Sequence, residues 1–94
     1  MTMNFKTIPM KVIEIPEKLS SAIGSFTFDD TNEQIGVTFR GRNTKYVYNV
    51  NGDYEIAKDD LLIEIDGANV DRENFSIGRY FNQMKSKKRL VEIT

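Results

Sequence analysis

Basic side chains beside aromatic ones are the residues of this chain best suited to chemistry. Arg40, Arg42 and Lys45 lie in one short stretch that leads into an aromatic run. A guanidinium group binds phosphate through paired hydrogen bonds and can stack on a base. This group and a second one, described next, indicate contacts with RNA or a nucleotide. The alternative is that these charges only keep a hairpin tip and a helix end in contact with solvent. The second group places five cations within eleven residues: Arg79, Lys85, Lys87, Lys88 and Arg89.

Two tyrosines, Tyr46 and Tyr48, stand two positions apart in a run of alternating apolar residues. Residues two apart on a strand point to the same side of a sheet, so both rings share a face. If that face is open, the rings form a stacking platform for bases. If it is covered, they are core residues whose hydroxyls reach an edge. We favour the buried interpretation, because the strand's other face carries Lys45, Val47 and Asn49, which cannot make a core.

The residues expected of an enzyme or a metal site are missing. The chain has no histidine and no cysteine, which removes the commonest general base and the most reactive nucleophile. Gly36, Gly41, Gly52 and Gly67 are expected to be separate turn residues, and they form no phosphate-binding loop. The spacing of Asp66, Asn69, Asp71 and Glu73 does not match the twelve-residue calcium loop. We therefore predict a non-enzymatic protein with no cofactor and no metal.

Length and composition indicate a single folded domain. The 94 residues are 39% hydrophobic and 11% aromatic, enough for one modest core. A chain without cysteine suits a reducing compartment, and its first residues do not resemble a signal peptide, so we expect a cytoplasmic protein. No run approaches the roughly 20 apolar residues of a spanning helix, which predicts that no membrane is involved.

Charge is distributed unevenly around a formal net charge of −1. The segment from Asp53 to Glu73 holds eight acidic residues against Lys58 and Arg72, a net charge of −6. Residues 79–94 hold five bases against one acid, a net charge of +4. Two solvated faces that attract each other account for this layout, and a basic patch that meets phosphate is the alternative.

Alternation at period two predicts a small antiparallel β-meander over about residues 20–50. Within its first strand, Phe26 and Phe28 share one face, while Ile23 lies on the other. Residues 1–19 contain both prolines and are expected to form an arm or an edge strand around KVIEI. The three strands of the meander are expected at 22–28, 35–40 and 45–50, with turns at 29–32 and 41–44.

The meander leaves one apolar face that needs a cover. Residues 53–66 follow with apolar residues at helical spacing, with Asp53 as N-cap and Gly67 just past the C-terminus. A rival interpretation is a hairpin at Asn51-Gly52, and the run LLIEI also tolerates a strand. We prefer the helix because the capping residue and the acidic first turns agree with the periodicity.

A second helix is predicted to begin after Ser76 as N-cap and to end near Lys87, following a polar loop at 68–74. Its apolar stripe would complete the cover of the sheet. Residues 89–94 read as a short strand that could pair with the N-terminal arm. The fold class is therefore α+β, a meander covered by one or two helices with short N- and C-terminal edge strands. The stripe consists of Ile77, Tyr80, Phe81 and Met84.

Three motifs in this order resemble the KTSC domain, which occurs at the C-terminus of some lysyl-tRNA synthetases and alone in bacterial and phage proteins. They are Ser-Ser before a strand, Tyr-x-Tyr in mid-chain and Ser-x-Gly-x-Tyr-Phe-Asn near the end. The resemblance implies one domain over 20–94, with a candidate insertion at 53–74, where the family's link is shorter. The matching residues are Ser20, Ser21, Tyr46, Tyr48, Ser76, Gly78, Tyr80, Phe81 and Asn82.

The motif residues are expected to be mainly structural. Ser76 would cap its helix and Gly78 would allow close packing. For Asn82 we favour a bond to a loop backbone, with ligand binding as the alternative. The family's association with a synthetase implies RNA binding, so the leading hypothesis is a binding module for RNA or a nucleotide. The alternative is a protein–protein adaptor or inhibitor, phage-encoded and acting in the host cytoplasm, that grips a host protein through a sheet edge or the acidic segment. Exposed edges would also allow a homo-oligomer.

Overall fold

A computed structural model describes residues 10–42, 44–71 and 73–93. Outside these ranges lie residues 1–9, which form the first part of the predicted arm, and also Asn43, Arg72 and Thr94. An antiparallel five-stranded sheet and two helices make up the fold, which confirms the α+β class. The elements in chain order are β1 (Met10–Glu14), β2 (Ile23–Asp29), β3 (Gln34–Phe39), β4 (Lys45–Val50), α1 (Tyr54–Val70), α2 (Ile77–Ser86) and β5 (Leu90–Glu92).

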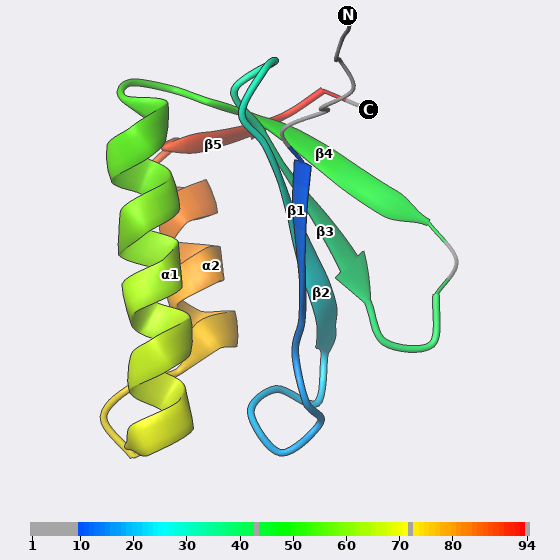
Figure 1. Cartoon of the computed structure of the whole chain (residues 1–94), viewed down its shortest axis with the longest axis vertical. Coiled ribbons are helices and arrows are strands. Elements are labelled where there is room, and N and C mark those ends of the chain that lie inside the picture. Colours follow the sequence, from blue (N-terminus) through cyan, green and yellow to red (C-terminus); the bar gives the residue numbers. More distant parts are fainter. Residues whose placement is uncertain (1–9, 43, 72, 94) are drawn as a thin grey trace, which may run out of the picture.

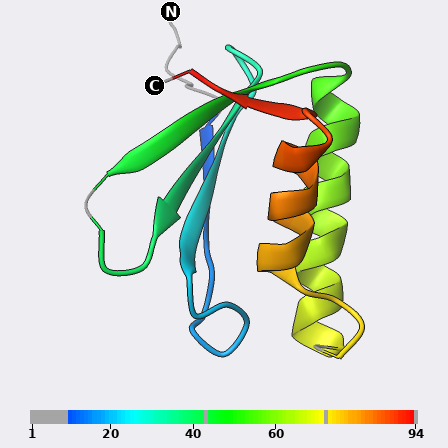
Figure 2. The same cartoon turned by 180° about the vertical axis from the view of Figure 1, so that it is seen from behind.

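The strands lie side by side in chain order, and each neighbouring pair is antiparallel. Both helices cover the same face of the sheet, with α1 nearer the viewer in Figure 1 and α2 nearer in Figure 2. The helix pair returns the chain to the β4 edge, so β5 pairs with β4. The expectation that the C-terminal strand could pair with the N-terminal arm is therefore wrong, because β1 and β5 occupy opposite edges.

The core lies between the sheet and the two helices, and Phe81 of α2 is at its centre. The Phe81 ring meets Phe26 of β2 at a centroid distance of 5.8 Å and Tyr48 of β4 at 5.5 Å, both edge to face. Phe28 lies beside Phe26 on the same face, as predicted. Tyr48 is only 3% exposed, so the buried interpretation is confirmed for this tyrosine.

A β-bulge corrects the predicted faces of the first strand. Ile23 pairs with Phe39 and Ser25 pairs with Thr38, so Gly24 is an extra residue without an opposite partner. An extra residue reverses the alternation on one side of the bulge. Ile23 is therefore buried in the core, although strict alternation had placed it on the outer face. Just before the bulge, the backbone N–H of Ile23 donates to the hydroxyl of Ser20 at 3.0 Å.

Helix α1 confirms the preference for a helix over a hairpin and continues further than predicted. Asp53 is the N-cap, and its Oδ1 accepts the backbone N–H of Ile56 at 3.1 Å. Gly67 does not end the helix, which runs to Val70 through the first residues of the predicted loop. A Cβ atom at Gly67 would lie 2.5 Å from the ring of Phe75. The glycine is therefore needed for a close approach rather than for a helix end.

Helix α2 begins as predicted, with Ser76 Oγ accepting the backbone N–H of Arg79 at 3.3 Å. Two predicted roles are wrong. A Cβ at Gly78 would meet no atom within 4 Å, so this glycine serves no close packing. Asn82 is exposed on the solvent side of α2, and its side chain forms no hydrogen bond to the part of the chain that the structure describes. It therefore ties no described loop in place.

Candidate functional site

An open hollow of about 360 Å³ lies beside the hairpin that joins β3 to β4. Ligand sites for small molecules usually start at roughly 300 Å³, so the hollow can hold part of a small ligand or one unit of a longer one. Three of the residues predicted from the sequence meet here. Its lining residues are Ala22, Phe39, Arg40, Arg42 and Tyr46.

Two aromatic rings form the wall of the hollow. Phe39 and Tyr46 meet edge to face with their centroids 5.5 Å apart, and both side chains are half-buried. The ring centroid of Phe39 also lies 6.3 Å from that of Phe81, so Phe39 and Tyr46 extend the aromatic core to the surface. The two tyrosines of the motif therefore differ: Tyr48 belongs to the core, while Tyr46 stands at its rim with part of its ring open to a ligand.

Arg42 is the cation best placed to bind a ligand in the hollow. Its side chain is exposed, and Nη1 donates a hydrogen bond to the hydroxyl of Tyr46 at 3.3 Å. Its other guanidinium N–H groups form no hydrogen bond with the described residues, so they can bind an anion. A guanidinium beside an aromatic ring can pair with a phosphate while the ring stacks on a base.

Arg40 plays a structural part in the site. Its Nη2 donates to three backbone carbonyls, those of Ile15 and Ser20 at 2.8 Å and that of Ile23 at 2.9 Å. Its backbone N–H also donates to Ala22 O at 2.7 Å. Arg40 therefore joins the hairpin to the segment between β1 and β2 and positions the Ala22 side of the hollow. It contributes positive charge there, but its Nη2 is already engaged.

Lys45 does not reach the hollow. Adjacent residues of a strand point to opposite faces, so Lys45 lies on the outer face of the sheet while Tyr46 faces the helices. The aliphatic part of Lys45 covers Gly36, with Cδ 3.1 Å from the position that a Cβ would take. Together with Val47 it lines a smaller depression of about 160 Å³ on that outer face. The predicted cluster of three cations is therefore divided between two faces.

Two cations of the second predicted group are engaged within the protein. Arg89 pairs with Asp60 of α1 at 2.9 Å and lies 3.4 Å from the hydroxyl of Tyr80. The hydrogen bond to Asp60, followed by the one to Tyr80, raises the pKa of Arg89. Lys85 Nζ lies 5.0 Å from the centre of the Phe81 ring, a cation–π contact. Lys87 and Lys88, past the end of α2, are exposed, and so is Arg79 in its first turn.

The hairpin group and the Lys87–Arg89 end of the second group lie at opposite ends of β4 (Figure 1), while Arg79 lies in the first turn of α2. Asn51, just after β4, donates its backbone N–H to Arg89 O at 2.8 Å and its side-chain amide to Lys88 O at 3.2 Å. The hairpin with Arg42 precedes the same strand. A strand of six residues spans roughly 20 Å, so the groups form separate sites and not one basic surface.

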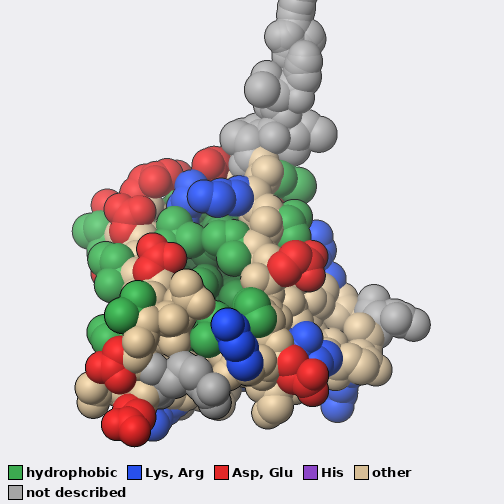
Figure 3. Space-filling model, turned by 60° about the horizontal axis from the view of Figure 1, so that its bottom comes forward, with side chains coloured by type: hydrophobic (Ala, Val, Ile, Leu, Met, Phe, Trp, Pro, Cys, Tyr) green, Lys and Arg blue, Asp and Glu red, His purple; other side chains and the backbone are tan. Residues whose placement is uncertain are grey.

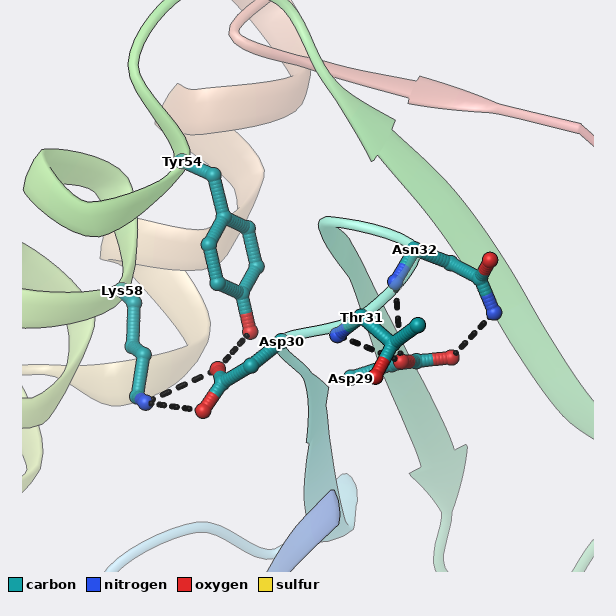
Figure 4. Close-up of polar contacts among 6 residues, drawn as sticks. All are labelled: Asp29, Asp30, Thr31, Asn32, Tyr54 and Lys58. Atoms are coloured by element: carbon teal, nitrogen blue, oxygen red, sulfur yellow. Dashed lines mark hydrogen bonds and ion pairs between the residues drawn. The ribbon is translucent and has the colours of Figure 1, made fainter. Parts of the chain in front are cut away.

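A polar cluster that the sequence did not reveal ties the β2–β3 turn to α1 (Figure 4). Asp30 accepts the hydroxyl of Tyr54 at 2.7 Å and the ammonium of Lys58 at 2.9 Å. The hydrogen bond from Tyr54, with that from Lys58, lowers the pKa of Asp30. Burial and the bond to Asp30 raise the pKa of the Tyr54 phenol. All three groups are satisfied by one another, so this cluster stabilises the fold. Asp29 closes the turn itself by accepting the backbone N–H groups of Thr31 and Asn32.

The fold and the site define a small α+β domain with an open arginine–aromatic hollow. Comparisons with protein-family models, curated proteins and solved structures give no match. The resemblance to the KTSC domain therefore stays a prediction. In the described ranges, no helix is long and apolar enough to cross a membrane. The same residues bring together no group of three or more His, Cys, Asp or Glu side chains that could hold a metal ion.

Proposed function

We propose that the protein is a non-enzymatic binding module whose hollow holds one nucleotide unit, either free or within single-stranded RNA. The observation that carries this proposal is the position of Arg42. Its guanidinium is hydrogen-bonded to the Tyr46 hydroxyl, beside the half-exposed rings of Tyr46 and Phe39. A base can stack on an aromatic ring while a neighbouring arginine binds its phosphate.

The energies of these contacts are those of a weak site, with a Kd of roughly millimolar order for one nucleotide unit. Stacking on one aromatic ring contributes about 1–3 kcal/mol per base, and a hydrogen bond to a charged group contributes about 1.5–3 kcal/mol. Arg40 adds positive charge to the same hollow. Three carbonyls hold its Nη2 in place, so its side chain keeps its position when a ligand binds. A longer RNA could bridge the roughly 20 Å along β4 to the separate basic site at Lys87 and Lys88, whereas a free nucleotide would use the hollow alone.

The absence of cysteine and the resemblance to the KTSC domain support a cytoplasmic RNA-associated role, in a host cytoplasm if the chain is phage-encoded. No catalytic step is part of this proposal. Since neither histidine nor cysteine is present, the chain lacks the side chains that most often move protons or attack substrates at neutral pH.

A titration with a fluorescent oligouridine, with adenosine monophosphate as competitor, tests the proposal. Affinity should fall as salt rises from about 50 to 200 mM, because phosphate contacts release counterions. Competition by the mononucleotide would identify a single-unit site, and binding of the oligonucleotide alone would identify an extended RNA site. Binding that is absent at low salt, or that does not respond to salt, would remove the proposal.

Variants locate the ligand. Arg42→Ala should weaken binding about tenfold or more, since one charged hydrogen bond is lost. Tyr46→Leu should have an effect of similar size, because it removes the stacking surface. Lys11→Ala is the matched control: it removes one positive charge from exposed strand β1, away from the hollow, and should change affinity less than twofold. Equal effects of Arg42→Ala and Lys11→Ala would show that the hollow is not the site.

A further inference from the structure

Helix α1 carries a row of apolar side chains on its solvent side. Ile56, Ile63 and Val70 are 56%, 62% and 88% exposed, respectively. They are seven residues apart, which is close to two helical turns, so they line up along one side of the helix. The buried residues Tyr54, Leu61 and Ile65 point to the opposite side. Helix α1 is therefore apolar on both the core side and the solvent side.

Helix α2 shows what an ordinary surface helix of this protein looks like. Its core side carries Ile77, Phe81 and Met84, and its exposed positions are polar, including Asn82 and Gln83. Isolated exposed apolar residues are common on protein surfaces and need no explanation. Three of them at seven-residue spacing form one apolar line along the helix, as the residues of a single heptad position do in helices that pack together.

Acidic residues border this row on one side. Glu55, Asp59 and Asp66 are exposed, and none forms an ion pair within residues 10–42, 44–71 and 73–93. Acidic and hydrophobic side chains alternate along the left margin of Figure 3, the side on which α1 lies. The acids on the other flank are engaged, because Asp60 pairs with Arg89 and Glu64 accepts the backbone N–H of Ser76 at 3.1 Å.

We propose that the outer face of α1 docks a basic amphipathic helix of a partner protein. The row from Ile56 to Val70 is about 21 Å long, which fits two heptads of a partner helix. Its apolar side chains would pack on the partner's apolar stripe, and lysine or arginine beside that stripe would meet the three open acids. The inference is independent of nucleotide binding and assigns a specific surface to the adaptor function.

Charge decides against two other occupants of this face. A second copy packed through α1 would bring the acids of one row, such as Asp59 and Asp66, close to those of the other, and like charges in contact oppose association. RNA is disfavoured for the same reason, because its phosphates would meet carboxylates. A basic partner helix is the occupant that satisfies both the apolar row and the acidic border.

A synthetic helical peptide provides the test. Its sequence would carry leucine at heptad spacing with lysine on both flanks, and a scrambled peptide of the same composition would be the control. Titration into isotope-labelled full-length protein, followed by NMR, should shift the amide signals of Ile56, Ile63 and their neighbours and leave the β3–β4 hairpin unchanged. Absence of shifts, or equal binding of the scrambled peptide, would overturn the inference.

Matched variants separate apolar packing from charge. Ile63→Ser should weaken peptide binding about tenfold or more, whereas Val12→Ser on the sheet, 58% exposed in the wild type, should change it less than twofold. Replacing Asp59 and Asp66 together by lysine should abolish binding of the lysine peptide and create binding of a glutamate version. Equal effects of Ile63→Ser and Val12→Ser, no change on charge reversal, or a wild-type dimer dispersed by Ile63→Ser would overturn the proposal.

Discussion

Replacing Arg40 with methionine separates a structural role of this arginine from a role in binding. The guanidinium Nη2 lies within 2.9 Å of three backbone carbonyl oxygens, two of them partly buried. Methionine keeps most of the aliphatic stem and removes the donors. The carbonyls of Ile15 and Ile23 would then lose a charged partner in a site that water reaches only in part. We therefore expect the substitution to reduce the free energy of unfolding.

The expected loss in the free energy of unfolding follows from the number of hydrogens on Arg40 Nη2. Nη2 carries two hydrogens for three acceptors, and the bond to Ser20 is exposed, so about two bonds contribute. Hydrogen bonds to charged groups contribute about 1.5–3 kcal/mol each, and partial exposure reduces this, which leaves about 2 kcal/mol in total. In a domain of this size, a loss of about 2 kcal/mol lowers the Tm by roughly 8–16 °C.

Urea unfolding followed by far-UV circular dichroism measures this loss. Arg40→Lys should recover part of it, because a single ammonium can donate to some of the same carbonyls. Arg42→Met is the matched control on the same hairpin: it removes one exposed 3.3 Å hydrogen bond and should change the free energy of unfolding by less than about 0.5 kcal/mol. The reasoning fails if Arg40→Met is as stable as Arg42→Met while weakening nucleotide binding to the same extent.

Two further predictions concern stability. The pKa of Asp30 is lowered from its ordinary value of 3.8, so its stabilising contribution is complete above that pH and is lost as the pH falls through the lowered pKa. The stability deficit of Asp30→Asn, measured by urea unfolding, should therefore shrink below pH 3.8, and a deficit constant down to pH ~2 would contradict this. Gly67→Ala should destabilise the protein by about 1 kcal/mol, because overcrowding at Phe75 outweighs the gain in helix propensity, whereas Gly78→Ala should stabilise it by about 0.5–1 kcal/mol. Equal shifts of the two urea midpoints would contradict the packing argument.

Local signals in the sequence predicted most of the secondary structure. Alternation located β3 and β4, and side chains that can accept a backbone N–H located the starts of both helices at Asp53 and Ser76. These features depend on residues only a few positions apart, which the sequence displays directly. The bulge at Gly24 escaped prediction, because it depends on how two strands align across a hairpin.

The sequence identified several residues of the candidate site but not how their side chains are arranged. Arg40 and Arg42 were predicted together, but nothing local in the sequence shows that Arg40 binds the carbonyls of a segment about 20 residues away while Arg42 stays exposed. Lys45 was predicted with them, although alternation along the strand places its side chain on the face opposite to that of Tyr46. The acidic segment was noted for its charge, yet the row of Ile56, Ile63 and Val70 became evident only when their exposure was known.

The α+β class, the helix caps and the aromatic core face follow from local sequence, because each arises from propensity and periodicity within one segment. Which charges are free to bind a ligand depends instead on how segments far apart in the chain pack together. Arg40, Lys58 and Arg89 are engaged by groups far away in the chain, while Arg42 is left beside an open hollow. The physical reason is that a cation can bind a ligand only while some of its N–H groups have no carboxylate or carbonyl partner, and packing between distant segments decides which cations meet such partners.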